Sequence, residues 1–149
     1  MGLMSDLGSG AVAIDTAVFI YFIEEDPRFL PHILPLFVAA DQGERVLVTS
    51  SLTLLEVLVV PYRAGNRQLA ERYEHLLTRS RGVRLIDLTR DQLRAAAQLR
   101  AATGLKTPDA LQLTAALGAG CTAFVTNDRR LPVVPGLHVL QLSSYVASR

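Results

Sequence analysis

Cysteine and histidine are scarce in this chain of 149 residues. The single cysteine, Cys121, cannot form an internal disulfide, and His32, His75 and His138 show no metal-ligand spacing. A disulfide-stabilised secreted domain and a zinc cluster are therefore both excluded. Because a lone free thiol is typical of a reducing compartment, we expect a cytoplasmic protein. We expect Cys121 to be a buried residue at a strand edge rather than a nucleophile, since no histidine stands in an obvious partnering position.

Long apolar runs are also missing, although 50% of the residues are hydrophobic. Charged or turn residues interrupt each run well before the roughly 20 residues that a membrane span needs, so we expect no membrane segment. Residues 1–10 lack the features of a secretory signal, and we expect them to be a flexible lead-in to one domain over residues 11–149. The apolar surplus has two explanations that the sequence leaves open, a homodimer and a thick two-sided core.

An excess of charge of one sign is the third missing feature. Fifteen Lys and Arg residues stand against fourteen Asp and Glu residues, which gives a net charge of +1. No global positive field therefore marks this protein as a nucleic-acid binder. Any contact with RNA must use local basic patches.

The apolar runs predict short strands that alternate with helices. Strands are expected over residues 11–14, 45–49, 83–88, 122–126 and 138–142. Helices are expected over residues 17–23, 30–42, 51–58, 66–79, 89–104 and 107–118, with a brief helix at the end of the chain. Because the strands are mostly apolar throughout rather than alternating, they indicate an α/β fold with a five-stranded parallel sheet covered on both faces.

Two acidic residues, Asp15 and Asp128, directly follow predicted strands. In open parallel sheets, ligands bind outside the carboxyl ends of the strands, so acids at these positions are well placed for chemistry. A turn residue or a helix cap is the alternative interpretation of either residue taken alone.

Glu56 lies in a helical segment in which nearly every neighbour is apolar. Burying an unpaired, ionised carboxylate costs roughly several kcal/mol, and such a group often becomes protonated instead. The alternative is a capping box with Thr53, which has the right spacing but starts the helix two residues later than Ser51 does. We favour a carboxylate at the edge of a cleft, kept ionised by a cation.

Asp109 falls in the first turn of the helix that Thr107 and Pro108 open, with Thr107 expected as its capping hydroxyl. The helix dipole favours an anion there by about 0.3 to 1 kcal/mol, which alone explains an acid at this position. The joint pattern is more informative. Two acids after strands and two on the first turns of helices are expected to converge at one end of one sheet. Four clustered like charges indicate a site for a hard cation.

With these residues in place, the sequence resembles the PIN-domain ribonucleases, in particular the VapC-type toxins of toxin/antitoxin pairs. The resemblance runs from about Val12 to Leu142 and rests on the order and spacing of four short motifs. These are AIDTAVF at 13–19, SLTLLEV at 51–57, TPDALQL at 107–113 and FVTNDRRL at 124–131.

The resemblance implies a three-layer α/β/α sandwich in which four residues form the acidic quartet of the family: Asp15, Glu56, Asp109 and Asp128. It further implies that Thr126 is a supporting hydroxyl and that Thr16 and Asn127 support the acids from behind. A Mg²⁺ or Mn²⁺ cofactor, an RNA substrate, dimerisation and inhibition by a small antitoxin protein also follow from the resemblance alone.

The expected reaction is metal-dependent hydrolysis of RNA phosphodiesters. Lys106, Arg129 and Arg130 flank two of the acids and are candidates for contacts with RNA phosphates, although each is equally interpretable as a solvated surface charge. One alternative is a phosphoacceptor or phosphatase with Asp15 as nucleophile, which is weakened because position 17 is Ala rather than a second acid. Another is a scaffold of the same fold that binds a partner without catalysis.

Overall fold

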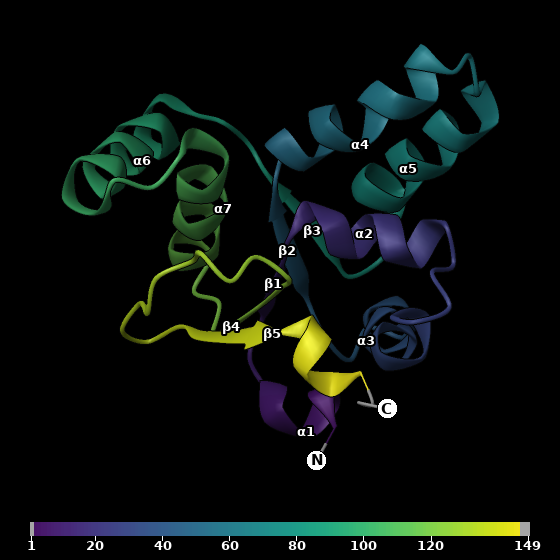
Figure 1. Ribbon diagram of the computed structural model, residues 1–149, viewed down its shortest axis with the longest axis horizontal. Coiled ribbons are helices and arrows are strands. Elements are labelled where there is room, and N and C mark those ends of the chain that lie inside the picture. Colours follow the sequence, from purple (N-terminus) through teal and green to yellow (C-terminus); the bar gives the residue numbers. More distant parts are fainter. Residues whose placement is uncertain (1, 147–149) are drawn as a thin grey trace.

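The computed structural model describes residues 2–146 and contains a five-stranded parallel sheet in the order β3-β2-β1-β4-β5 (Figure 1). The strands are β1 (Val12–Ile14), β2 (Leu47–Ser50), β3 (Val83–Ile86), β4 (Ala123–Thr126) and β5 (His138–Gln141). The helices are α1 (Leu3–Leu7), α2 (Thr16–Ile23), α3 (Leu30–Asp41), α4 (Leu52–Arg63), α5 (Arg67–Arg79), α6 (Arg90–Thr103) and α7 (Thr107–Gly118), followed by the 3₁₀ helix η1 (Leu142–Tyr145). The predicted α/β class and parallel sheet are confirmed.

Helices cover both faces of the sheet because successive strand residues point to opposite sides. Val12 and Ile14 of β1 join a core cluster with residues of α1, α2, α3 and α5. Ala13, between them in the chain, joins a second cluster with Leu113 of α7. In Figure 1, α6 and α7 accordingly lie on one side of the sheet and α2, α3 and α5 on the other. Both faces are thus built from continuously apolar strands, as the sequence pattern indicates.

The central strand β1 separates two halves of the sheet. From β1 the chain proceeds outward through β2 to β3, and then crosses back to β4, which pairs with β1 in parallel with Ile14 opposite Val125. The strand order therefore reverses between β1 and β4. In open α/β sheets a crevice for ligands forms at such a switch point, outside the carboxyl ends of the strands. Asp15 is the residue that directly follows β1.

The N-terminal segment differs from its prediction. A flexible lead-in is expected over residues 1–10, but Leu3–Leu7 form a helix in which Leu3 and Leu7 are each 3% exposed and pack into the larger core cluster. The error has a simple cause. The two leucines stand four residues apart, which places them on one helix face, and a segment this short gives too weak a periodic signal to be recognised.

Two helix boundaries also differ from the prediction. The helix expected to end or kink near Pro61 continues as α4 to Arg63, with Pro61 buried inside its last turn. Burial of the proline ring offsets the hydrogen bond that its missing N–H cannot make. The N-cap of α7 is Lys106 rather than Thr107, which is the first helical residue and makes no capping hydrogen bond.

Within residues 2–146, no helix is long and apolar enough to cross a membrane.

Candidate active site

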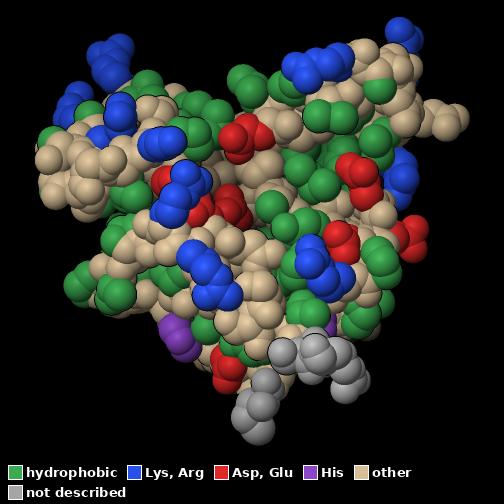
Figure 2. Space-filling view, in the orientation of Figure 1, with side chains coloured by type: hydrophobic (Ala, Val, Ile, Leu, Met, Phe, Trp, Pro, Cys, Tyr) green, Lys and Arg blue, Asp and Glu red, His purple; other side chains and the backbone are tan. Residues whose placement is uncertain are grey.

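All four predicted acids line one cleft of about 380 Å³ at the carboxyl edge of the sheet. Asp15 follows β1, Asp128 follows β4, Glu56 lies on α4 and Asp109 lies on α7. Figure 2 shows acidic side chains in the hollow between α7 and α4, with basic side chains on the α6 side of it. The convergence predicted from the joint pattern is therefore what the fold produces.

Asp15 accepts a hydrogen bond on each of its two carboxylate oxygens. It caps α2, where Oδ1 accepts a hydrogen bond of 2.9 Å from the Thr16 backbone N–H, and Oδ2 accepts one of 2.6 Å from the Thr126 hydroxyl. Burial raises the pKa of Asp15, the two hydrogen bonds lower it, and the charge of Asp128 raises it further. The net upward direction indicates a charge for which the protein itself provides no full compensation.

Glu56 lies in the second turn of α4, not the first as expected, and it accepts a hydrogen bond of 2.6 Å from the Thr16 hydroxyl. The capping-box alternative is wrong. Ser51 precedes the helix without a side-chain capping bond, and Thr53 directs its hydroxyl to Thr49, Thr16 and Gln112 instead of a backbone N–H. Glu56 is therefore fixed by a tertiary contact to α2 rather than by its own helix.

Asp109 is the third residue of α7 and stands beside the other acids. Burial raises its pKa, and the charges of Asp128, Asp15 and Glu56 act in the same direction against the opposing charge of Arg130. The first-turn position favours its charge through the helix dipole, whereas burial and the neighbouring acids favour its protonated form.

Asp128 is paired with a cation of the protein. Arg130 donates two hydrogen bonds of 2.9 Å, one to each carboxylate oxygen, and the backbone N–H of Arg130 adds a third. The Arg130 hydrogen bond is the main cause that lowers the pKa of Asp128. The backbone N–H of Asp128 donates to the Thr126 hydroxyl at 2.9 Å, so Thr126 links Asp15 to the start of the Asp128 loop.

Two predicted site residues do not line the cleft: Asn127, expected to support the acids, and Arg129, expected to contact RNA phosphates. Asn127 donates to the Tyr21 hydroxyl at 3.3 Å and accepts from the Ser143 N–H at 2.8 Å. Arg129 donates to the Ser143 hydroxyl at 3.0 Å and is absent from the cleft lining among the described residues. The side chains of Asn127 and Arg129 thus link the loop after β4 to other segments. They point away from the cleft because alternate residues of this loop turn to opposite sides. Of the three predicted basic contacts, Lys106 and Arg130 line the cleft.

The sequence reasoning missed three buried polar residues, Thr49, Thr53 and Gln112. Together with the predicted supporting residue Thr16 they form what we call the Thr–Gln network. Gln112 is 5% exposed within a helix whose residues 110–116 are all buried. A polar residue amid apolar neighbours is the same signal that drew attention to Glu56, and it was available in the sequence.

Cys121 matches its prediction, since it is buried in the second core cluster and burial raises its pKa to about 11.

The cleft has the chemistry of a hard-cation site. Its acidic lining residues supply carboxylate oxygens only, with no Cys or His among the residues that line it, and this donor set suits Mg²⁺ or Mn²⁺. The raised pKa values of Asp15 and Asp109 indicate uncompensated negative charge in the same place. Within residues 2–146, no three Asp, Glu, His or Cys side chains are already grouped as ligands. Arg130 is bound to Asp128, and Thr16 is bound to Glu56.

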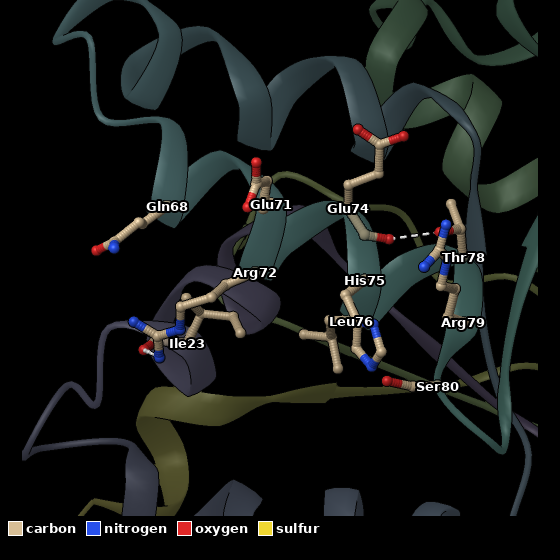
Figure 3. Close-up of a pocket in the computed structure, with 10 residues that line it drawn as sticks. All are labelled: Ile23, Gln68, Glu71, Arg72, Glu74, His75, Leu76, Thr78, Arg79 and Ser80. Atoms are coloured by element: carbon tan, nitrogen blue, oxygen red, sulfur yellow. Dashed lines mark hydrogen bonds between the residues drawn. The ribbon is translucent and has the colours of Figure 1, made fainter.

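A larger cavity lies elsewhere. It measures about 850 Å³, and α5 forms most of its lining together with Ile23 at the end of α2 (Figure 3). Arg72 donates to the Ile23 carbonyl at 3.0 Å across this cavity. This cavity contains none of the four cleft acids, so its size does not identify it as the active site.

Comparison with known proteins gives a consistent result. The PIN domain model matches residues 12–137, and no curated protein matches the chain. The fold is similar to that in the crystal structure of VapBC2 from Rickettsia felis bound to a DNA fragment from their promoter, with a TM-score of 0.67 at 18% identity over 88% of this chain and 98% of that one. A toxin-antitoxin complex from Klebsiella pneumoniae gives a TM-score of 0.64 at 20% identity, with 85% and 95% of the two chains covered.

A third similar structure is VapC20 of Mycobacterium tuberculosis, described as a Sarcin-Ricin loop cleaving toxin. Its TM-score is 0.62 at 15% identity, and the match covers 76% of this chain and 87% of that one. These identities are low enough that the structures establish the fold alone. The family model spans most of the sequence, including all four acids of the cleft. This chain therefore belongs to the PIN domain family.

Proposed function

We propose that this protein is a metal-dependent endoribonuclease and that the four acids of the cleft are its catalytic and metal-holding residues. The observation that carries the proposal is the meeting of Asp15, Glu56, Asp109 and Asp128 in one cleft at the switch point of the sheet. Four carboxylates gathered from two loops and two helices have no structural task that needs them together. Their mutual repulsion is a cost to folding that a bound cation removes.

Each acid has a role suited to its surroundings. Asp15, fixed on both oxygens and placed after the central strand, would be the principal metal ligand, with Asp109 and Asp128 completing the set. Glu56 would share in holding the metal and would orient or deprotonate the attacking water. Bound Mg²⁺ or Mn²⁺ would supply polarisation of the phosphate and a hydroxide at neutral pH. Thr126 and the Thr16 N–H would keep Asp15 in one rotamer throughout.

Two basic residues are suited to the RNA backbone. Lys106 and Arg130 line the cleft beside the acids, and an RNA phosphate placed there would meet both. Such contacts are independent of sequence and position the substrate without selecting it. The non-catalytic scaffold remains the second candidate, and cleavage separates the two.

The test is cleavage of a fluorophore-labelled single-stranded RNA of mixed sequence with Mg²⁺, with Mn²⁺ and with excess chelator. We expect cleavage with either metal and none with chelator. Asp26→Asn changes a half-buried loop acid outside the cleft that accepts a hydrogen bond from the Arg28 N–H, and it serves as the matched control for Asp15→Asn. Undiminished cleavage in chelator would sink the metal-dependent mechanism, and the absence of any cleavage would favour the scaffold.

We further propose that the protein is the toxin of a cytoplasmic toxin/antitoxin pair. The support is its family and its fold similarity to two proteins solved in complexes of that kind. A small antitoxin that covers the acid cleft would keep RNA out. Co-expression with the product of the neighbouring open reading frame should yield a stable complex without ribonuclease activity. A freely tolerated, active monomer would contradict the toxin assignment and leave the nuclease proposal intact.

A homodimer is also proposed, and α4 offers the surface for it. Leu55, Val59 and Tyr62 are 61%, 40% and 60% exposed, and their spacing places them on one face of this helix. An apolar helix face of this kind is the expected contact between copies. Val59→Glu should shift the mass measured by light scattering from dimer to monomer, whereas the same change at Val133, which is 96% exposed in a loop, should not.

A further inference from the structure

The Thr–Gln network lies directly behind the Glu56 side of the acid cleft. Gln112 of α7, Thr53 of α4 and Thr49 of β2 are 5%, 0% and 1% exposed. Thr16 at the start of α2 connects this buried group to the Glu56 carboxylate. Four elements distant in the sequence therefore meet through side-chain hydrogen bonds at one point. Groups buried this deeply exchange no hydrogen bonds with water, so their mutual orientation is set within the protein.

The orientation of the Gln112 amide follows from its neighbours. The backbone N–H of Ser50 lies 3.2 Å from one amide atom, and because an N–H can only donate, that atom is Oε1. The Thr49 hydroxyl adds a second donor to Oε1 at 3.3 Å. The amide nitrogen therefore points the opposite way. It donates to the Thr53 hydroxyl at 2.7 Å and toward the Thr16 hydroxyl at 3.4 Å.

The direction of the next hydrogen bond is fixed in turn. The Thr16 hydroxyl carries one proton, and a carboxylate can only accept, so the 2.6 Å contact with Glu56 Oε1 uses that proton. The oxygen of Thr16 is then an acceptor for the Gln112 amide at 3.4 Å. The single proton of the Thr53 hydroxyl goes to Thr49 at 2.7 Å, because the Thr49 proton is donated to Gln112 Oε1. The network thus runs one way, from the Ser50 backbone through the amide to Glu56.

We propose that Gln112 is a positioning residue for Glu56, acting through Thr16 and Thr53. Without the amide, the Thr16 proton is free to turn to Thr53 and away from the carboxylate. Glu56 then loses the donor that fixes its rotamer, although no cleft acid has been changed. The inference rests on the proposed function only for what Glu56 does chemically, because the positioning itself is a property of the hydrogen bonds.

The first experiment removes the amide and keeps the shape. Gln112→Met should lower kcat for cleavage of labelled single-stranded RNA in Mg²⁺ by about 10- to 100-fold, the usual effect of losing a group that orients a metal-site residue. KM for RNA should stay within about twofold, because Gln112, which borders the cleft, is only 5% exposed and both ends of its amide are hydrogen-bonded within the protein. Mn²⁺ affinity, measured by electron paramagnetic resonance without RNA, should fall by about tenfold.

A double-mutant cycle separates positioning from general destabilisation. In a Glu56→Gln background, Gln112→Met should cause less than about a twofold further loss of kcat and of Mn²⁺ affinity, since the residue it positions is already altered. A purely structural role predicts that the two losses multiply. Leu113→Val is the control on the same helix, because Leu113 is buried in the second core cluster and makes no contact with the network. It should lower the melting temperature and leave kcat unchanged.

Conservative variants test the direction of the network. Thr53→Ser keeps the hydroxyl and should retain kcat within about threefold, whereas Thr53→Val should reproduce Gln112→Met. Multiplying losses in the cycle, or Thr53→Val with parental kcat and Mn²⁺ affinity, would overturn the inference. If the parent cleaves no RNA, the nuclease proposal fails by itself. The cycle is then read from Mn²⁺ affinity alone, and parental Mn²⁺ binding by Gln112→Met would still overturn the positioning role.

Discussion

The two sides of the acid cleft are built differently. On one side, Asp15 accepts a short hydrogen bond from the fully buried Thr126 hydroxyl, and Glu56 accepts one from Thr16, which is half-buried and contacts the buried Gln112. On the other side, Asp109 carries a pKa raised by burial and by neighbouring acids, and Asp128 is held by Arg130, whose side chain is 70% exposed. One side is thus fixed by the core, and the other is set by charges at the surface. We infer that the first side determines geometry and the second adapts when a cation and substrate arrive.

The largest expected effect is at the fixed side. Asp15→Asn keeps the shape and most hydrogen bonding but removes the charge, so RNA cleavage should fall more than about 100-fold and the stabilisation by Mg²⁺ should shrink. The melting temperature without metal should not drop, because repulsion from Asp128 and the cost of burying a charge are both relieved. Melting curves and cleavage are measured on the same variant. A protein that melts lower without metal yet cleaves RNA at the parental rate would mean that Asp15 is a structural turn residue.

Thr126 joins the two sides and should give the next largest effect. Its hydroxyl donates to Asp15 and accepts from the Asp128 N–H, so Thr126→Val frees both groups at once. We expect a 10- to 100-fold loss of kcat, roughly that of other orienting residues at metal sites. Thr126→Ser retains the hydroxyl and should recover most of the activity. Equal rates for the Val and Ser variants would show that the hydroxyl has no orienting role.

Arg130 tests the adaptable side with a smaller change. Because its guanidinium occupies both oxygens of Asp128, Arg130→Gln should release the carboxylate and tighten Mn²⁺ binding by about two- to fivefold, the modest scale of an exposed ion pair. Arg129→Gln is the matched control, since Arg129 bonds to Ser143 outside the cleft. Weaker Mn²⁺ binding in the Arg130 variant would contradict a competition between the arginine and the cation.

The smallest expected effect is on the pH dependence of stability. The folded-state pKa of Asp15 is raised above its ordinary value of 3.8. The folded protein therefore binds this proton more tightly than the unfolded chain, so ionised Asp15 opposes folding at neutral pH and the opposition lessens as pH falls through the folded pKa. Urea unfolding without metal should show the parent gaining stability relative to Asp15→Asn as pH falls from neutral. A difference that widens in the opposite direction would reverse the assigned pKa shift.

Much of the fold was predictable because local signals agree with the tertiary structure. The Thr89 hydroxyl caps α6, and Gly104 ends it in a left-handed conformation with φ of 74°, both as the sequence indicates. The helix at Leu3–Leu7 was missed because its stability comes from the core that it joins, not from its own five residues.

The acidic site was predictable in composition but not in arrangement. A sequence motif indicates that an acid follows a strand, and the parallel sheet then brings such acids to one edge. The motif does not indicate which group each acid is hydrogen-bonded to. Glu56 is held by Thr16, 40 residues earlier in the chain, and Arg130 rather than a second acid faces Asp128. Asn127 and Arg129 were misplaced for the same reason, since sequence neighbours in a loop point to different sides.

The sequence by itself determined the layers of this protein and the four acids of its cleft, because apolar periodicity, helix caps and residue type are local properties. Only the tertiary structure decided which hydroxyl holds which carboxylate and how Gln112 orients the group behind Glu56. Such contacts join elements whose separation in the chain bears no relation to their separation in space, and their geometry arises when the core packs.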